Sequence, residues 1–369
     1  MKRKISLLLV ALMLMTSIVA CNNAQKPAEQ EKPVETAEEK PAETTEPAEA
    51  EAGAIAKIGL GSVTSTKKSA DATAEKPAGA QADVTIAAVA LDADGKIVRV
   101  EIDVAQTKAS FLADNTNADL EEGKVYKTKM ELGSEYGMLK SSGIGKEYNE
   151  QLQAFMDYLV GMTVDEVKAI PTKFKDDNHL NVPDVADLAS SVTIDVGTYM
   201  AAVVEATENT VDATGATKLG LGIETDVAGT AATPEKPARI QVNTYMNALA
   251  LDDAGKIVAN IVDVVQAKID VDAEGKIVER NENVETKKDL KERYGMTKAS
   301  AIGKDWFEQM AEFEKYTLGK TIEEIASIPV VERDANHVAV PDVPELTSTV
   351  TITIDGYQAV MAKAAANAK

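Results

Sequence analysis

The side chains best suited to chemistry in this sequence form one short pattern that occurs twice. The pattern is acid-x-x-Ser-x-x-Thr, and its two copies end 158 residues apart. The members are Asp187, Ser190 and Thr193 in the first copy and Glu345, Ser348 and Thr351 in the second. Each threonine stands in a Val-Thr-Ile context, which by itself favours a β-branched strand residue. The pattern is therefore either a plain strand or part of a functional site, and wider features have to decide.

Other catalytic signatures are absent from the sequence. It contains no His-Glu-x-x-His, no P-loop and no Gly-x-Ser-x-Gly. Gly59-Leu60-Gly61 and Gly220-Leu221-Gly222 lack the third glycine of a dinucleotide fingerprint, and we interpret them as turns where each copy begins. With two histidines and one cysteine in the chain, hydrolytic triads, zinc sites, disulfides and iron–sulfur clusters are disfavoured.

The repeated pattern resembles the flavinylation motif Asp-x-x-Ser-Gly-Ala-Thr of the FMN-binding domain family. That family includes FMN-carrying subunits of bacterial Na⁺-pumping and Rnf-type complexes, and two-domain lipoproteins of Gram-positive extracellular electron transfer. In the family, a flavin transferase joins the FMN phosphate to the threonine hydroxyl as a phosphoester. The resemblance implies covalent FMN on Thr193 and Thr351, with the acidic and serine residues of each copy completing the recognition pattern.

The two copies depart from the family motif at defined positions. The Gly-Ala pair is replaced by Ser191-Val192 in the first copy and by Thr349-Val350 in the second, where the leading acid is Glu345. A third stretch, Asp212 to Thr217, looks similar to the motif but is one residue too short. We interpret it as a linker and keep Thr217 as an alternative acceptor.

The function implied by the resemblance is that of an electron-transfer flavoprotein rather than a stand-alone enzyme. The cofactor carries out the redox chemistry, so the protein has to position the cofactor, tether it and leave it exposed to its partners. The implied partners are a flavin transferase for maturation, a membrane electron donor and an extracellular electron acceptor. Two alternatives stay open: a surface lipoprotein that binds a small ligand or a wall polymer, with avidity from the duplication, and a structural spacer.

Lysines recur at equal positions in an otherwise acidic protein. The pairs are Lys129 and Lys287, Lys140 and Lys298, and Lys146 and Lys304. They could stabilise the phosphate or an anionic reduced flavin, or they could form a solvated face. We include Lys146 and Lys304 among the candidate cofactor-binding residues.

Aromatic, methionine and histidine residues recur in the same way. For Tyr136, Met138, Tyr294 and Met296, packing in the core is favoured over packing on a flavin ring. His179 and His337 follow Asn178 and Asn336, and a hydrogen-bonded turn is favoured there over a proton donor.

These recurrences indicate that most of the chain is an internal duplication. Leu91 to Val98 matches Leu251 to Val258, and Tyr136-Gly137-Met138 matches Tyr294-Gly295-Met296. We predict an FMN-binding-like module over 54–208 and a second over 209–369. Each should be α+β, a small antiparallel sheet with helices.

Local patterns predict the elements of each module. Val98, Val100 and Ile102 alternate with polar residues as in a strand. Apolar residues from Leu152 to Leu159 share one helix face, as do the matching residues from Trp306 to Thr317. Thr163 with Glu166, and Thr321 with Glu324, fit capping boxes. The stretches 190–196 and 348–354 are β-like, and an alanine-rich helix follows each.

The N-terminal segment indicates export. Basic residues precede an apolar run that ends in a lipobox-like Ile-Val-Ala-Cys, so residues 1–21 are predicted to be a lipoprotein signal with Cys21 as the lipidation site. Residues 22–53 are rich in Pro, Glu and Ala, which predicts a disordered tether. The expected location is the extracytoplasmic face of the cell membrane, held by the lipid anchor.

The charge balance narrows the possible partners. The formal net charge is −21, with 60 acidic and 39 basic side chains. A surface this acidic repels nucleic acid, so nucleic-acid binding is not expected.

Overall fold

Long antiparallel strands form the centre of the protein in a computed structural model that describes residues 53–369. The predictions for the signal segment 1–21, for Cys21 and for all but the last residue of the tether 22–53 lie outside the described residues. Below, the first half means residues 53–208 and the second half residues 209–369.

The first sheet has five antiparallel strands in the order β4-β3-β2-β1-β7. Its last strand comes from the chain just beyond the first half, so the sheet joins the two halves. The strands are β1 (Lys57–Ser65), β2 (Gly79–Leu91), β3 (Ile97–Phe111), β4 (Ala118–Asp119) and β7 (Thr210–Asp212).

The second sheet has three antiparallel strands in the order β10-β9-β8. Short two-stranded ladders accompany each half, β5 with β6 and β11 with β12. The bounds are β8 (Lys218–Thr230), β9 (Ala238–Leu251), β10 (Ile257–Val271), β5 (Thr172–Lys173), β6 (Val182–Pro183), β11 (Val330–Val331) and β12 (Val340–Pro341).

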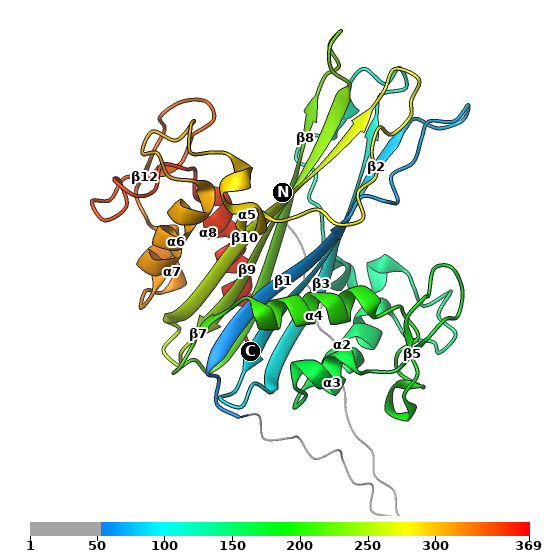
Figure 1. Cartoon of the computed structure of the whole chain (residues 1–369), viewed down its shortest axis with the longest axis vertical. Coiled ribbons are helices and arrows are strands. Elements are labelled where there is room, and N and C mark those ends of the chain that lie inside the picture. Colours follow the sequence, from blue (N-terminus) through cyan, green and yellow to red (C-terminus); the bar gives the residue numbers. More distant parts are fainter. Residues whose placement is uncertain (1–52) are drawn as a thin grey trace, which may run out of the picture. The chain divides into compact units, whose positions relative to one another are not determined.

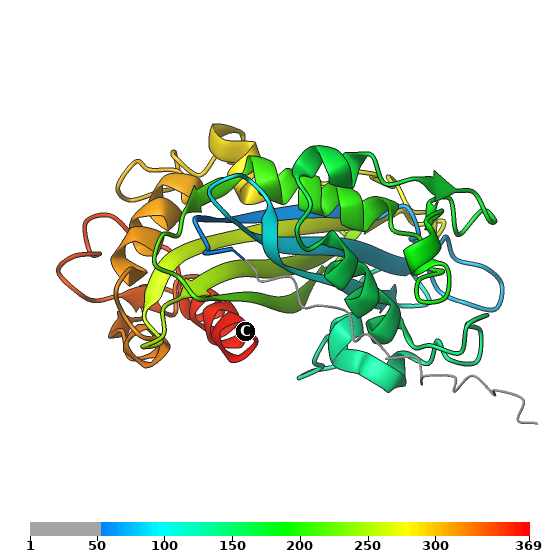
Figure 2. The same cartoon turned by 90° about the horizontal axis from the view of Figure 1, so that it is seen from below.

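The two sheets pack face to face over a shared apolar core. Ile58, Ile86 and Ala88 from the first sheet meet Leu219, Met246 and Val265 from the second, and all are buried. Figure 2 shows the strands stacked in the middle with helices on both outer sides. Residues 53–369 therefore form one compact unit with a common core between the sheets.

Helices cover the outer face of each sheet. In the first half, α2 and α4 pack over β1 to β3, and in the second half α6 and α8 pack over β8 to β10 (Figure 1). The helices are α1 (Lys129–Leu132), α2 (Tyr148–Leu159), α3 (Val164–Lys168), α4 (Gly197–Glu208), α5 (Lys287–Leu290), α6 (Trp306–Thr317), α7 (Ile322–Ala326) and α8 (Asp355–Ala366), with 3₁₀ turns η1 (Gly133–Tyr136), η2 (Ala186–Leu188) and η3 (Lys291–Tyr294).

Several sequence predictions are confirmed. The fold is α+β with antiparallel sheets, β3 covers the alternating residues, and α2 and α6 carry the predicted apolar faces. Both predicted capping boxes form, at Thr163 with Glu166 and at Thr321 with Glu324. The boundary between modules at 208/209 stays a prediction.

The interpretation of the Gly-Leu-Gly repeats as turns is wrong, because both lie inside strands. A Cβ on Gly59 would lie 1.8 Å from the Ala206 carbonyl oxygen, and one on Gly61 would lie 2.3 Å from the Ala206 nitrogen. Gly220 and Gly222 meet α8 in the same way, with contacts of 2.0 and 2.1 Å. These glycines let a helix lie directly on the strand backbone.

The predicted strands at 190–196 and 348–354 are also wrong, because both stretches are irregular loops before a helix. The hydrogen bonds of Asp195 explain why residues 190–196 do not form a strand. Its carboxylate accepts hydrogen bonds from the backbone N–H groups of Leu180, Asn181 and Gly197, at 2.7 to 2.9 Å. The side chain thus supplies backbone partners that a strand ladder would otherwise provide. The predicted alanine-rich helices follow as α4 and α8.

Candidate functional site

Thr193 lies in the loop before α4, held by a buried glutamine of α2. Its backbone N–H donates to Gln151 Oε1 at 2.8 Å, and its hydroxyl donates to the same oxygen at 3.2 Å. The Gln151 amide nitrogen in turn donates to Ser142 Oγ at 3.3 Å and to the Lys146 carbonyl at 3.2 Å. All polar atoms of this fully buried amide are therefore used, which fixes the position of the threonine.

The second half repeats this arrangement around Thr351. Its N–H and hydroxyl donate to Gln309 Oε1 at 2.8 and 3.2 Å. Gln309 donates to Ser300 Oγ and to the Lys304 carbonyl, both at 3.1 Å. Two threonines chosen from sequence alone thus occupy matching, equally bonded positions.

The acidic and serine members of the pattern lie apart from the threonine contacts. Asp187, Ser190, Glu345 and Ser348 are exposed on the turn that precedes each threonine. Such side chains are accessible to a partner protein, but they form no hydrogen bond with the threonine side chains among residues 53–369.

Lys146 and Lys304 contribute their backbone carbonyls, not their side chains, to the contacts around the threonines. Their carbonyls accept from the buried glutamines, while their side chains are only half-buried. The Lys304 ammonium lies 3.6 Å from Glu312. Lys140 and Lys298 are exposed.

Lys129 and Lys287 are the more deeply placed lysines, each between two aromatic rings. The Lys129 ammonium lies 5.1 Å from the Tyr136 ring centre and 5.0 Å from that of Tyr148. The Lys287 ammonium lies 4.9 Å from Tyr294 and 5.2 Å from Trp306. These contacts have the geometry of cation–π interactions.

Burial lowers the pKa of both lysines to about 8. Asp83 opposes the effect at Lys129, while Lys68 and Lys108 add to it by repulsion. Asp263 and Asp226 oppose the effect at Lys287. A buried lysine with a shifted pKa beside aromatic rings is typical of functional sites.

Helix α2 joins the lysine cage to the threonine. Tyr148 and Gln151 lie one turn apart on its buried face, so the ring against Lys129 neighbours the amide that holds Thr193. The Tyr148 hydroxyl also donates to the Tyr199 hydroxyl of α4 at 3.2 Å. In the second half, Trp306 Nε1 donates to Tyr357 at 2.8 Å.

Buried carboxylates hold the short helices that carry these lysines. Asp103 accepts from the Met130 N–H at 3.1 Å, and Asp263 accepts from the Lys288 N–H at the same distance. Burial raises the pKa of both carboxyls to about 6, although these hydrogen bonds oppose the rise.

The remaining candidates form local turns or core contacts. The Nδ1 atoms of His179 and His337 lie 2.7 and 2.8 Å from Asp176 and Asp334, as predicted for hydrogen-bonded turns. The four recurring Tyr and Met residues pack partly buried against the cores. Thr217 is exposed between β7 and β8, and its N–H donates to the Leu251 carbonyl at 2.8 Å.

Residues 53–369 contain neither a cluster of metal ligands nor a helix that could span a membrane. Within this range no three His, Cys, Asp or Glu side chains are grouped as metal ligands. No helix in the same range is both long and apolar enough to cross a membrane.

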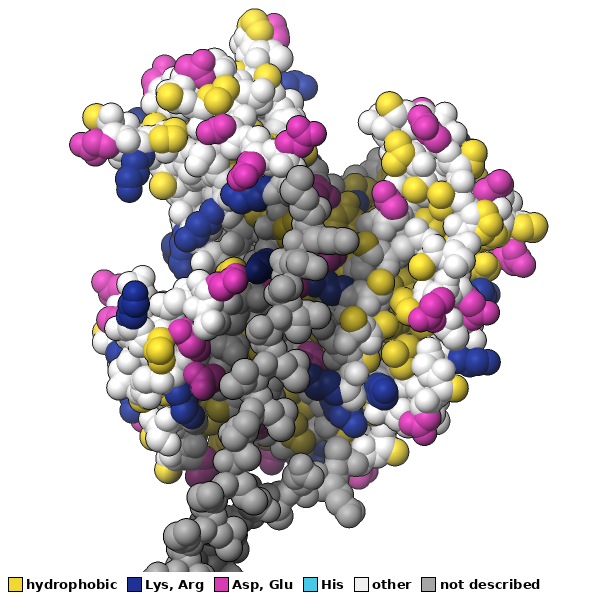
Figure 3. Space-filling view, turned by 180° about the vertical axis from the view of Figure 1, so that it is seen from behind, with side chains coloured by type: hydrophobic (Ala, Val, Ile, Leu, Met, Phe, Trp, Pro, Cys, Tyr) yellow, Lys and Arg dark blue, Asp and Glu magenta, His cyan; other side chains and the backbone are white. Residues whose placement is uncertain are grey.

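In Figure 3, acidic and basic side chains intermingle on the visible face, and Lys and Arg gather beside a hollow.

Sequence reasoning missed the glutamines and serines that hold the threonines. Gln151 and Gln309 recur at the same offset as the threonines and interrupt the apolar face of a helix. A polar residue retained on a core face in both halves was the available signal. Ser142 and Ser300 gave no signal beyond recurrence.

Comparison with known proteins finds a distant and partial similarity. A chlorophenol reductase from Desulfitobacterium hafniense is 32% identical over 129 residues, which is 32% of this chain and 39% of the reductase. The chain thus spans well under half of that relative's length. No family model and no solved structure matches the chain.

Proposed function

We propose that the protein is an extracytoplasmic electron carrier with FMN attached covalently to Thr193 and Thr351. The observation that carries the proposal is the repeated contact of each threonine with a buried glutamine, at hydroxyl distances of 3.2 Å in both halves. The duplication into two modules is part of the proposal.

The surroundings of the two threonines fit a flavin. A reduced flavin is an anion, and Lys129 and Lys287 are cations already held beside aromatic rings. When bound, FMN would supply one- and two-electron redox chemistry. The chain's own residues would hold the attachment point, offer a cation and exclude water.

Attachment would need an outside enzyme, because among residues 53–369 the threonine hydroxyls contact only amide oxygens and no base. The Thr193 hydroxyl donates to an amide oxygen, which does not accept a proton at neutral pH. A flavin transferase would take that proton as the threonine oxygen displaces a nucleoside monophosphate from a flavin dinucleotide, which breaks the phosphoanhydride bond of the dinucleotide and forms the phosphoester. The exposed Asp187 and Ser190, with Glu345 and Ser348, are the side chains it would recognise.

The proposal extends to location and partners. Cys21 would carry the lipid anchor, and the Pro/Glu-rich segment would hold the folded part away from the membrane. Electrons would enter from a membrane donor and leave to an extracellular acceptor. The partial similarity to a chlorophenol reductase, a redox protein by name, supports a redox role.

Co-expression with a flavin transferase tests the proposal. The product should be yellow and should give a fluorescent band after denaturing electrophoresis, with a mass increased by two FMN less two waters. Thr193→Val and Thr351→Val should each remove one increment. Thr217→Val is the matched control and should keep both.

Two results would count against this function. A colourless product under those conditions would favour a non-redox binding protein. Retention of both increments in the Thr193→Val, Thr351→Val double variant would show that flavin attaches elsewhere.

A further inference from the structure

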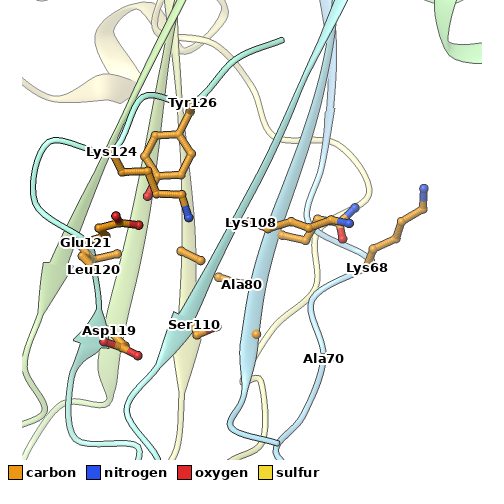
Figure 4. A pocket seen from close by; sticks show the side chains of 13 residues that line it. Lys68, Ala70, Ala80, Lys108, Ser110, Asp119, Leu120, Glu121, Lys124 and Tyr126 are labelled. Atoms are coloured by element: carbon orange, nitrogen blue, oxygen red, sulfur yellow. The ribbon is translucent and has the colours of Figure 1, made fainter. Parts of the chain in front are cut away.

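A separate pocket of about 580 Å³ lies at the ends of β2 and β3. This size is within the ~300–1,000 Å³ of small-molecule sites. Small residues form its floor, namely Gly79, Ala80, Ala109 and Ser110. Figure 4 shows Lys124 and Tyr126 on one side of it, with Lys68 and Lys108 on the other.

Three lysines line the pocket, and two of them form no ion pair among residues 53–369. Lys68 lies 3.4 Å from Asp83, whereas Lys108 and Lys124 form no ion pair within residues 53–369. The Lys124 ammonium lies 5.1 Å from the Tyr126 ring centre. Asp119 and Glu121 also line the pocket, on the side of Lys124. Lys124 thus combines an ammonium group that forms no ion pair among residues 53–369 with a neighbouring aromatic ring.

The second half fills the corresponding place with its own ion pair. Gly79 pairs with Ser110 across β2 and β3, as Arg239 pairs with Asp270 across β9 and β10. Arg239 and Asp270 form a two-pronged ion pair at 2.6 and 2.8 Å. The first half has small residues at these positions, and no atom lies within 4 Å of a Cβ built on Gly79.

The side of the pocket that carries Lys124 also differs between the two halves. Glu282 stands at the position equivalent to Lys124, and it pairs with Lys67 at 2.6 Å. The first half thus has small residues at Gly79 and Ser110 where the second half has the Arg239–Asp270 ion pair, and it has Lys124 where the second half has a paired glutamate.

We propose that this pocket binds a small planar organic anion. Its carboxylate or sulfonate would lie between the ammonium groups of Lys68, Lys108 and Lys124. Its flat body would lie on the Gly79–Ala80 floor beside the Tyr126 ring. Binding does not depend on the flavin, so protein without flavin is sufficient to test it.

Calorimetric titration of the unflavinylated full chain with naphthalene-2,6-disulfonate tests the proposal at low salt. One molecule should bind per chain. Lys108→Gln and Lys124→Gln should each weaken binding about fivefold, which is the effect of a partly exposed charge pair. Lys268→Gln, the matched change in the second half, should leave affinity unchanged.

The decisive variant, the graft, places the ion pair of the second half at the equivalent positions of the first half. Gly79→Arg with Ser110→Asp should abolish binding while melting temperature stays at the wild-type value, since Arg239 and Asp270 form this pair on the neighbouring sheet. Unchanged affinity in the graft would overturn the proposed location. Equal affinity for uncharged 2,6-dihydroxynaphthalene, or for inorganic sulfate, would overturn the proposed ligand class.

Discussion

Glu205 is predicted to destabilise the protein above neutral pH. It occupies on α4 the position that Lys363 occupies on α8. Lys363 lies 2.5 Å from Glu131, 3.1 Å from Glu224 and 2.6 Å from the Ile223 carbonyl. Glu205 instead faces Asp289, Asp263 and Glu208, beside a cavity of about 850 Å³ between the halves. Lys363 is thus attracted by neighbouring carboxylates, whereas Glu205 is repelled by them.

Burial, followed by repulsion from Asp289, raises the pKa of Glu205 from 4.5 to about 7. At ~1.4 kcal/mol per tenfold change, this would cost about 3 kcal/mol for a fully buried group. Screening at a half-exposed carboxylate reduces the cost to about 1 kcal/mol. The folded state holds the proton more tightly, so the cost is absent below 4.5, develops up to pH 7 and is complete above it.

Thermal unfolding followed by circular dichroism between pH 5 and pH 8.5 measures this effect. Glu205→Gln should raise the melting temperature by about 2 °C at pH 8 and leave it unchanged at pH 5. Lys363→Met is the matched comparison. It should lower the melting temperature at both pH values, because it removes the ion pair with Glu131, whose pKa is held below its usual value despite burial.

A Glu205→Gln variant with the same melting temperature as wild type across this pH range would refute the reasoning. So would an equal gain at pH 5 and pH 8, because a proton-independent gain would come from packing rather than charge.

Three further changes have expected outcomes. Gln151→Leu should cost about 1–3 kcal/mol in urea unfolding, because it leaves the Thr193 N–H and the Lys146 carbonyl without their partner, and should lower flavin incorporation at Thr193 alone; a Gln153→Ala control should cost little. Gly61→Ala should cost about 2–3 kcal/mol, because its Cβ would overlap the α4 backbone, whereas Gly79→Ala should be near neutral; equal effects in calorimetry would exclude close packing as the cause. Asp103→Asn should remove the part of the stability that wild type loses as pH rises from 3.8 to about 6, the range between its usual and folded pKa, and an unchanged pH profile would contradict that assignment.

Strands and helices with strong local patterns were predictable from sequence. The alternation from Val98 onward and the apolar face of α2 were sufficient, because each element buries one face. The capping boxes at Thr163 and Thr321 were predictable for the same local reason.

Features set by distant contacts were not predictable. The glycines of β1 and β8 looked like turn residues, and only their contact with α4 and α8 explains them. The loop at 190–196 has strand-forming residues, but Asp195 draws it into contact with Leu180 and Asn181. Tertiary contacts override local β propensity in such cases.

The candidate site was predictable in part. The threonines were found from their spacing, and the recurring lysines were noted without a means to rank them. Burial distinguishes Lys129 and Lys287 from the exposed Lys140 and Lys298, and burial cannot be read from recurrence alone.

Peptide mass spectrometry of the protein purified from the cells that naturally produce it tests the central claim most directly. We expect the peptides that contain Thr193 and Thr351 each to carry the mass of one FMN less one water, with fragment ions that place it on the threonine. Unmodified peptides at both positions in native material would contradict the account.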